Sequence, residues 1–291
     1  MCLNIPPWLT TVTTVHPQVI GATSQRQPSA DLDAYTERMT ILAVAAGPQD
    51  LGDLQRYTLL VATDGAQVRA AQRLRHDVFA GELGATLHSS EPGLDVDAFD
   101  EFCDHLIIRE DLTGEVVGTY RMLPPERAAA AGGLYADTEF DLSGLAPLRD
   151  GLVETGRSCV HPDHRSGAVI NLMWAGIARY MHLHGHRWLA GCASVPLADG
   201  GVTAAGVWDL AQRKHLVPPA WRVRPRNPWT ADVEPPAKIV VPPLLKGYLR
   251  LGSWVGGAPA HDPDFDCADF YVLLSLDRIN PRYMRHFLGQ E

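Results

Sequence analysis

The chain has 291 residues, of which 46% are hydrophobic and 20% are charged, a composition typical of globular proteins. This length is enough for one large domain or two small ones with a sizeable buried core. The formal net charge of −9 argues against a protein that coats nucleic acid, because such a protein needs a basic face. The 5 cysteines are widely spaced and form no C-x-x-C pair, which argues against a disulfide framework or a zinc ribbon and favours a reducing compartment.

No stretch of the sequence contains the ~20 consecutive apolar residues that span a bilayer. Residues 1–15 have no basic residue before their apolar stretch, so they make a poor signal peptide. We therefore expect a cytoplasmic protein, which a lipid substrate or product can still bring to the inner face of a membrane as a peripheral protein. The sequence leaves the oligomeric state open.

The N-terminal segment, residues 1–55, has no sustained hydrophobic period and is rich in Thr, Ser, Pro, Gln and Ala. This composition is typical of a flexible extension, so residues 56–291 are expected to form the ordered domain. Asp64 is expected to cap the first helix, with Gln67 three positions later as its capping-box partner. Residues 80–100 then predict a long acidic loop, and loops of this length are usually functional or disordered.

The ordered domain alternates predicted strands and helices. Strands are expected at 57–63, 105–109, 115–123, 152–161, 186–194 and 270–276, and helices at 167–184, 202–213 and 242–251. The strands at 105–109 and 115–123 flank a turn and predict a β-hairpin, and Gly185 is expected to end the helix that precedes it. Together these elements predict an α/β arrangement on a mixed sheet.

The most informative unit is ETGRSCVHPDHRSGAVINLMWAGIARYM, residues 154–181, where a strand, a short loop and a helix follow one another. The loop holds Arg165 and Gly167, and the unpaired N–H groups at the start of a helix favour a bound anion. The phosphate of a phosphopantetheine arm is such an anion, on coenzyme A or on acyl carrier protein. An ordinary strand-to-helix connection explains the same spacing.

Glu154 and Arg157 lie three positions apart on the strand before this loop, so a regular strand would point them to opposite faces. A bulge, a feature that gathers beside active sites, would bring them together. A carboxylate near the strand centre can take a proton from an ammonium, directly or through water, as an amine nucleophile requires. A structural Glu–Arg pair is the alternative interpretation.

Opposite charges also come from three separate elements: Arg75 on the first helix, Asp97 and Asp100 in the acidic loop, and Arg121 on the hairpin. This set suits a bound zwitterion, with Asp for its amine and Arg for its carboxylate. A surface ion-pair network would use the same residue types.

Two other patterns point to weaker hypotheses. Cys159 and His161 alternate to the same face of one strand, but no third partner of a cysteine nucleophile is evident, and buried cysteines are more often inert. The histidines on either side of Gly185 are not expected to bind zinc, because this glycine breaks the helix that would align them. We therefore expect no metal site.

Six stretches in chain order are distinctive: LRHDVFAGELGA (74–85), FDEFCDHLII (99–108), VVGTYRMLPP (116–125), ETGRSCVHPDHR (154–165), LAGCASVP (189–196) and VPPLLKGYLRLGSWVGGAPAHDPDF (241–265). With them, residues 57–280 resemble the ornithine-acyl-carrier-protein N-acyltransferases, a GNAT-fold family that makes lyso-ornithine lipid. The chain also resembles, more distantly, the acyl-homoserine-lactone synthases through Arg75, Phe79, Asp97, Asp100, Arg121, Glu154 and Arg157.

Two departures from these families stand out. The pyrophosphate loop of GNAT proteins, Q/R-x-x-G-x-G/A, is shortened here to four residues that begin at Arg165 and continue Ser-Gly-Ala. The Trp that the lactone synthases carry after the Phe is missing from residues 80–100. The shortened loop favours acyl carrier protein over coenzyme A, because the carrier-bound arm ends in one phosphodiester and needs fewer N–H donors.

The resemblance implies a GNAT-type α/β (α+β) fold, a central twisted mixed sheet with helices on both faces. It implies transfer of a fatty or 3-hydroxy fatty acyl group from acyl carrier protein to the amine of an amino acid, with ornithine as the expected acceptor. The acyl-phosphopantetheine thioester is then a co-substrate, and no cofactor is expected to be bound permanently.

The resemblance also implies roles for particular residues. Glu154 is expected to deprotonate the amine, an N–H near Ser158 or Cys159 to hold the oxyanion, and Tyr248 to reprotonate the leaving thiolate. The donor is expected to lie in a splayed gap between central strands, against Ser158, Cys159, Val160, Arg165, Gly167 and Ala168. The acceptor or a supporting ion-pair network is expected at Arg75, Asp97, Asp100, Arg121 and Arg157.

An acidic carrier protein would need a local basic platform on a chain of charge −9. The candidates are Arg222, Arg224, Arg226, Lys246 and Arg250. A solvated basic loop is the alternative interpretation.

Three other functions stay open on the sequence. A coenzyme-A-dependent GNAT acyltransferase would act on another amine. A lactone-synthase-like enzyme would consume S-adenosylmethionine, and the missing Trp disfavours it. A non-catalytic acyl-binding module would release no free carrier thiol.

Overall fold

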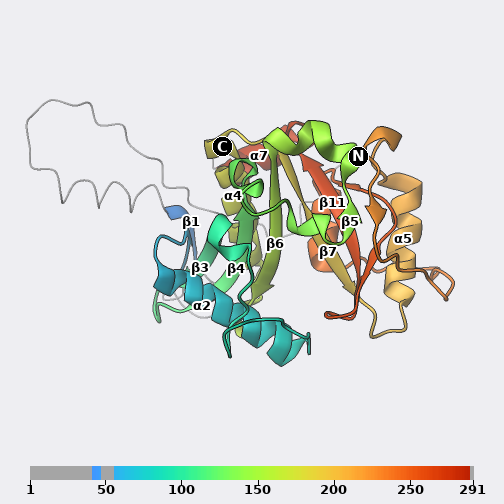
Figure 1. Ribbon diagram of the computed structural model, residues 1–291. Coiled ribbons are helices and arrows are strands. Elements are labelled where there is room, and N and C mark those ends of the chain that lie inside the picture. Colours follow the sequence, from blue (N-terminus) through green and yellow to red (C-terminus); the bar gives the residue numbers. More distant parts are fainter. Residues whose placement is uncertain (1–40, 47–55, 289–291) are drawn as a thin grey trace, which may run out of the picture.

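The computed structural model describes residues 41–46 and 56–288 (Figure 1). They form a nine-stranded sheet in the order β1-β2-β3-β4-β6-β7-β11-β10, with β9 paired to β11, and a two-stranded sheet of β5 and β8. The strands are β1 (Ile41–Ala46), β2 (Arg56–Val61), β3 (Asp104–Glu110), β4 (Val116–Leu123), β5 (Phe140–Asp141), β6 (Leu152–Val160), β7 (Trp188–Pro196), β8 (Arg224–Pro225), β9 (Trp254–Val255), β10 (Ala260–Asp262) and β11 (Cys267–Ser275). The α-helices are α2 (Gly65–His76), α3 (Pro125–Ala128), α4 (Gly167–His184), α5 (Val202–Lys214), α6 (Pro243–Arg250) and α7 (Pro281–Leu288).

The helix ends follow from capping residues in the sequence. Asp64 caps α2 by accepting a hydrogen bond from the Gln67 N–H at 2.8 Å, as expected. Ser166 caps the start of α4, and Gly185 ends it in the left-handed conformation with φ 69°. The predicted bounds of this helix, 167–184, are confirmed.

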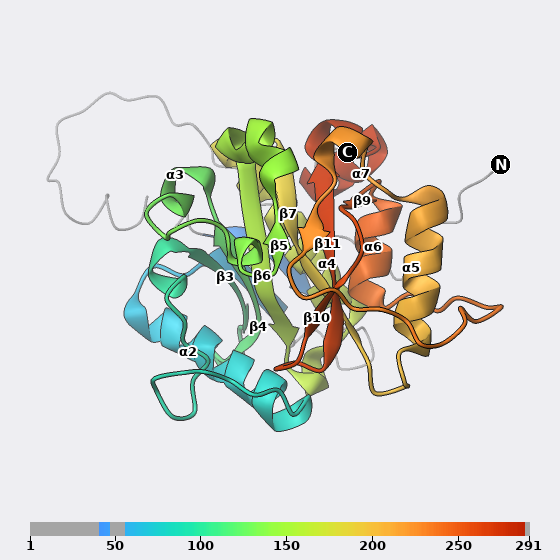
Figure 2. The same ribbon diagram turned by 45° about the vertical axis from the view of Figure 1, so that its right-hand side comes forward.

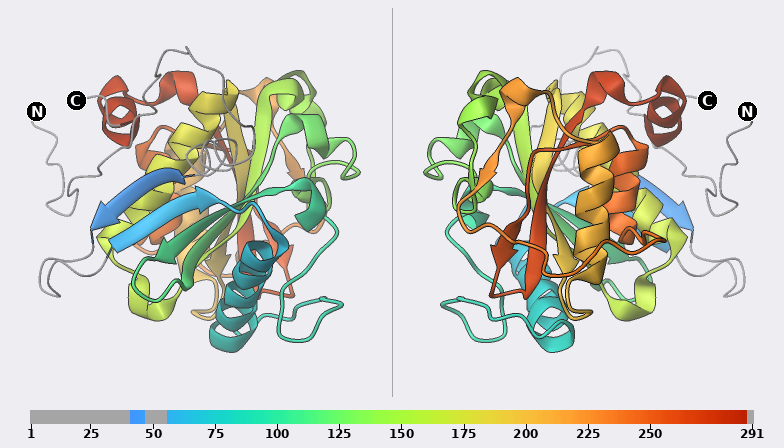
Figure 3. Two further views of the ribbon diagram at one scale, coloured as in Figure 1. Left: turned by 90° about the vertical axis from the view of Figure 1, so that its left-hand side faces the viewer. Right: turned by 90° about the vertical axis from the view of Figure 1, so that its right-hand side faces the viewer.

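The sheet separates two layers of side chains, because successive residues of a strand point to opposite faces. On β7, Leu189 packs into the core beneath α4, α5 and α6, whereas Ala190 packs into a second core on the other face. The second core is formed by the segment from 134 to 152 and by residues near β8, and α2 covers the neighbouring strands on that side (Figures 2 and 3). The predicted mixed sheet with helices on both faces is confirmed.

The register of β6 creates the main irregularity of the sheet. Thr119 pairs with Cys159 and Arg121 with Gly156, so Arg157 and Ser158 together face the single residue between them on β4. Arg157 has φ 51°, which is rare outside glycine and marks the bulge. The bulge considered from the sequence is therefore present.

Strand β6 is parallel to β7 for only three residue pairs, from Leu152↔Trp188 to Glu154↔Ala190. Beyond this point β6 continues along β4 and β7 continues along β11, so the two strands part. The splayed gap expected from the resemblance is present, and Glu154 lies at its vertex.

Two expectations about the N-terminal half need correction. The sheet begins at Ile41, inside the segment expected to be a flexible extension, because β1 pairs with β2. Residues 1–40 and 47–55 lie outside the described residues. The expected loop at 80–100 also begins inside a π-helical segment, Asp77–Glu82, which continues from α2.

Within the described ranges, no helix is long and apolar enough to cross a membrane.

Candidate active site

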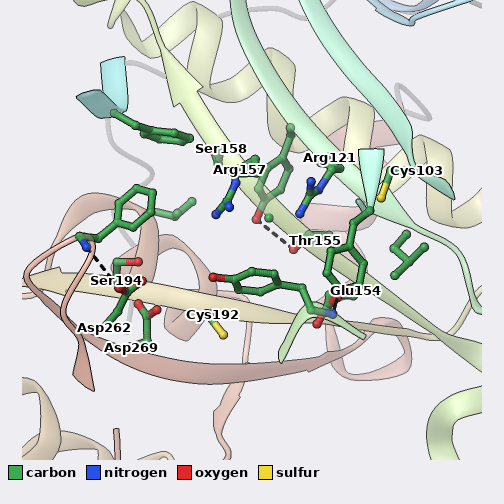
Figure 4. A pocket seen from close by; sticks show the side chains of 18 of the residues that line it. Cys103, Arg121, Glu154, Thr155, Arg157, Ser158, Cys192, Ser194, Asp262 and Asp269 are labelled. Carbon is green, nitrogen blue, oxygen red and sulfur yellow. Dashed lines mark hydrogen bonds between the residues drawn. The ribbon is translucent and has the colours of Figure 1, made fainter. Parts of the chain in front are cut away.

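A cavity of about 240 Å³ lies where β6 and β7 part. Its wall includes Arg121 from β4, Glu154, Thr155, Gly156, Arg157 and Ser158 from β6, and Cys192 and Ser194 from β7 (Figure 4). Tyr120 and Leu244 also line it. Tyr120 packs in the core beneath α4 and α6, so the cavity extends through the gap in the sheet towards that face.

Glu154 is buried at the vertex of the gap, with 5% of its surface exposed. Its carboxylate accepts hydrogen bonds from the N–H groups of Tyr135 (2.6 Å) and Ala136 (2.8 Å). Burial raises the pKa of Glu154 to about 7, although these two N–H donors and the charge of Arg121 oppose the rise. A fixed carboxylate that titrates near neutral pH is suited to accept a proton from an ammonium.

The charged residues expected to work together do meet beside the cavity. Arg75 is fully buried and contacts Asp95 (2.8 Å) and Asp100 (2.7 Å). Arg121 contacts Asp97 (2.6 Å) and Asp100 (2.8 Å). Burial would raise the pKa of Asp100, but the hydrogen bonds and charges of the two arginines hold it well below its ordinary value. This is a buried network rather than a surface one.

Arg157 joins the same network from the bulge of β6. Its guanidinium lies 3.2 Å from Asp95 and 3.5 Å from Asp97, and its centre lies 5.2 Å from the Tyr135 ring. It forms no ion pair with Glu154, whose carboxylate is held by backbone groups instead. The bulge therefore brings both side chains to one cavity without pairing them.

The residues expected to hold the acyl donor lie in different parts of the structure. Ser158 lines the cavity, whereas Cys159 is buried beneath α2, and burial raises the pKa of its thiol to about 12. A thiol with this pKa is a poor nucleophile at neutral pH. Gly167 lines a groove on the other face of the sheet, and Ala168 lies half-buried beside it in the first turn of α4.

Arg165 was expected to contribute to an anion site, but its guanidinium is already paired with a carboxylate. Its guanidinium donates to both carboxylate oxygens of Glu82, at 2.6 and 2.5 Å, and to the carbonyl of Val160 at 3.1 Å. It lines none of the three cavities described for this protein. A phosphate would therefore have to displace Glu82 to reach it.

Tyr248 lies behind the cavity rather than in its wall. Its hydroxyl hydrogen-bonds to that of Tyr120, which in turn accepts from Thr155 at 3.1 Å. Tyr120 and Thr155 line the cavity and Tyr248 does not. Tyr248, the expected proton donor to the thiolate, therefore does not line the cavity, whereas Tyr120, which the sequence did not single out, does.

An apolar groove of about 350 Å³ lies between α4, α6 and α7. Lys246 and Arg250 are at its rim, close to the start of α4. The other three expected platform residues, Arg222, Arg224 and Arg226, belong to the β8 segment that packs on the opposite core. The five cations therefore do not form one platform: Arg226, for instance, donates to the Asp137 carbonyl at 2.8 Å.

The histidines near the end of α4 make ring contacts. His184 and His186 stack with centroids 5.8 Å apart, and His184 hydrogen-bonds to the Tyr180 carbonyl. Across the described chain, the side chains spaced closely enough to share a metal ion are two acidic groups beside the cavity instead: Glu139, Cys192 and Asp269, and Asp262, Cys267 and Asp269.

These acidic residues were missed by sequence reasoning. Asp262 and Asp269 line the cavity opposite Arg121 and Arg157 (Figure 4). Asp262 lies in the stretch HDPDF that carried part of the resemblance, and this was the one signal that could have drawn attention to it.

A mixed sheet whose neighbouring strands β6 and β7 part, with a buried carboxylate at the vertex of the gap, is the arrangement of an acyltransferase of the GNAT class. Residues 74–175 match the family described as acetyltransferase (GNAT) domain. Curated relatives named L-ornithine N(alpha)-acyltransferase are 32–36% identical over 79–84% of this chain, so the chain belongs to that family and is an N-acyltransferase. The relative from Brucella abortus is 34% identical over 81% of this chain and 90% of its own length. The relative from Rhodobacter capsulatus is 36% identical over 79% of this chain and 94% of its own length.

Solved structures with a similar fold include FeeM, an N-acyl amino acid synthase from uncultured soil microbes. It is 13% identical with a TM-score of 0.48, covering 77% of this chain and 92% of that one. BjaI, a CoA-dependent acyl-homoserine lactone synthase, is 17% identical with a TM-score of 0.45, covering 78% of this chain and 82% of that one.

Proposed function

We propose that the protein transfers a fatty acyl group from the phosphopantetheine thioester of acyl carrier protein to the α-amine of ornithine. The observation that carries this proposal is Glu154, a carboxylate with a pKa of about 7 at the vertex of the gap between β6 and β7. The names of the relatives support ornithine as the acceptor.

In this mechanism the α-ammonium loses a proton to Glu154, and the free amine attacks the thioester carbonyl. The amide C–N bond forms as the C–S bond breaks; the nitrogen releases its second proton to water as it becomes an amide, and the thiolate leaves. N–H groups of the bulge at Arg157 and Ser158 are available to the oxyanion, because a bulge leaves a residue outside the regular ladder. Tyr120, whose hydroxyl hydrogen-bonds to that of Tyr248, gives a proton to the thiolate and regains one from water.

The donor is proposed to approach from the face of the sheet that carries α4 and α6. The groove there contains Gly167 at the start of α4, where N–H groups favour a phosphate. Lys246 and Arg250 at its rim provide positive charge for an acidic carrier protein. This arrangement needs neither Arg165 nor the β8 arginines.

The test is release of free carrier thiol from acyl carrier protein in the presence of ornithine, with N-acylornithine confirmed by mass spectrometry. Glu154→Gln should lower kcat by about 10²–10⁴-fold. Glu126→Gln, an exposed residue of α3, is the matched control and should leave kcat unchanged. Wild-type turnover in the folded Glu154→Gln protein would exclude Glu154 as the base, and no thiol release by the wild type would exclude the reaction.

A further inference from the structure

Three carboxylates that take no part in the proposed reaction meet beside the cavity. Asp262 ends β10, Asp269 lies on β11, and Glu139 precedes β5, so three separate segments bring them together. Glu139 and Asp269 each have an atom within 4.8 Å of the Cys192 sulfur and of one another, and Asp262 is as close to Asp269. Asp269 is 3% exposed.

These carboxylates lack a cationic partner. Glu139 has hydrogen bonds with the Tyr135 hydroxyl and with Asp269, and Asp269 also accepts from the Cys267 thiol at 3.5 Å and from Ser194. In the part of the chain that the structure describes, no lysine or arginine forms an ion pair with any of the three. Burying several negative charges without a cation costs free energy. Such carboxylates must therefore either hold protons or bind a cation. Burial and the charge of Asp269 accordingly raise the pKa of Glu139 to about 9.

The cluster lies where two cavities meet. Asp262 and Asp269 line the cavity that contains Glu154. Asp262 and Glu139 line a neighbouring cavity of about 360 Å³, and Arg157 belongs to the walls of both. Figure 4 shows Asp262 and Asp269 across the space from Arg121 and Arg157. A molecule held between the arginines and Glu154 would therefore extend towards the acidic groups.

A diamino acid carries three charges that match this arrangement. Its α-carboxylate suits Arg121 or Arg157, its α-ammonium suits Glu154, and its side-chain ammonium is left over. We propose that Glu139, Asp262 and Asp269 form a subsite, the distal acidic subsite, that binds the side-chain ammonium of the acceptor amino acid. This inference rests on the proposed function and adds how the enzyme selects a diamino acid and directs acylation to its α-amine.

With this subsite, an amino acid that has no charge on its side chain should be a poor acceptor. Norvaline has the carbon skeleton of ornithine without the terminal amine, so it leaves the buried carboxylates unpaired. We expect wild-type kcat/KM to be about 10²–10³-fold higher for ornithine than for norvaline, as for other sites whose buried polar groups lose their partner.

The experiment compares the wild type with Asp269→Asn and Glu139→Gln, which keep the side-chain shape and remove charge. Asp266→Asn is the matched control, because Asp266 lies in the turn between β10 and β11, is exposed and has φ 46°, a conformation that Asn also adopts. Acyl transfer from hexadecanoyl acyl carrier protein is measured with each amino acid, and binding of each amino acid is measured by calorimetry without donor.

The proposal predicts that the two charge-removing variants lose about 10²-fold or more in ornithine binding and kcat/KM, while norvaline values change little. The control should keep the wild-type preference. Equal wild-type affinity for both amino acids, or an equal loss for both in the variants, would overturn the subsite. Stoichiometric Zn²⁺ binding that the variants lose, with the ornithine preference unchanged, would also overturn it. Ornithine-selective binding without acyl transfer to any amino acid would instead contradict the proposed function.

Discussion

A Cβ built on Gly191 would lie 2.2 Å from the carbonyl oxygen of Thr155, closer than any side chain can approach a backbone. These residues directly follow Glu154 and Ala190, the last pair between β6 and β7. The backbones thus meet at their closest just before they part. Glycine at this point sets the vertex of the gap, and with it the position of the Glu154 carboxylate.

Gly191→Ala should therefore destabilise the protein, because the added methyl group forces the two strands apart. Overpacking of this kind costs about 1–3 kcal/mol of unfolding free energy. Urea unfolding followed by circular dichroism measures it. Gly65→Ala, in the first turn of α2 where a Cβ meets open space, should change stability by no more than ~1 kcal/mol and in the stabilising direction. Equal urea midpoints for the Gly191→Ala protein and the wild type would show that the strands can move apart there without loss of stability.

Arg75→Met should be strongly destabilising. Arg75 is fully buried, and its loss leaves Asp95 and Asp100 without their main cationic partner. Removing one side of a buried ion pair costs about 3–5 kcal/mol. Arg69, on the same helix as Arg75, forms an exposed ion pair with Glu91 from the following loop, and Arg69→Met should cost less than about 1 kcal/mol. The two variants are compared by chemical denaturation at one ionic strength, and similar losses would contradict a structural role for the buried network.

The rate of acyl transfer should rise with pH and level off above about 7. The base form of Glu154 is the carboxylate, and burial raises the pKa of this group to about 7, so its active fraction increases through that pH. The measurement is kcat from pH 5.5 to 9 at saturating donor and acceptor. In Glu154→Gln the rise of kcat near pH 7 should disappear. A rise with the same midpoint in that variant would show that another group causes it.

Removing one carboxylate of the distal acidic subsite should stabilise the free protein at alkaline pH. Burial and the Asp269 charge raise the pKa of Glu139 from its ordinary 4.5 to about 9, and burial raises the pKa of Asp269. A carboxyl group with a raised pKa holds its proton more tightly in the folded state, so folding loses stability as pH rises from about 4.5 to 9. The melting temperature of Asp269→Asn should exceed that of the wild type by more at pH 8.5 than at pH 5. A difference that does not change with pH would show that the charges do not repel.

Local patterns predicted the elements that depend on near neighbours. Helix α4 begins and ends at the predicted residues because Ser166 and Gly185 act on backbone groups within one turn. The hairpin of β3 and β4 depends on a short turn between them in the same way. Strand β1 was missed because six residues among polar ones give little periodicity, and pairing with β2 alone makes them a strand.

The candidate site was predictable only in part, because its members come from distant segments. Glu154 and Arg121 were singled out from strand spacing and charge and again by the resemblance, and the register of β4 and β6 places both in the wall of one cavity. The pairing of Arg165 with Glu82 joins residues 83 positions apart, and nothing in either local pattern indicates it. Asp269 was equally hard to predict, because the sequence does not show which face of β11 borders the gap.

Tyr120 and Tyr248, whose hydroxyls hydrogen-bond to one another, are expected to differ in their contribution to turnover. Tyr120 lines the cavity and Tyr248 only supports it through their hydrogen bond. If Tyr120 returns the proton to the leaving thiolate, Tyr120→Phe should lower kcat by about 10²-fold or more, in the range of general acid catalysis. Tyr248→Phe should lower it by less than about 10-fold, because it removes one neutral hydrogen bond behind the reacting group. Both are measured as kcat for thiol release, with melting temperatures to confirm folding. A larger loss in Tyr248→Phe would return the proton-donor role to Tyr248, and equal, small losses would leave solvent as the proton source.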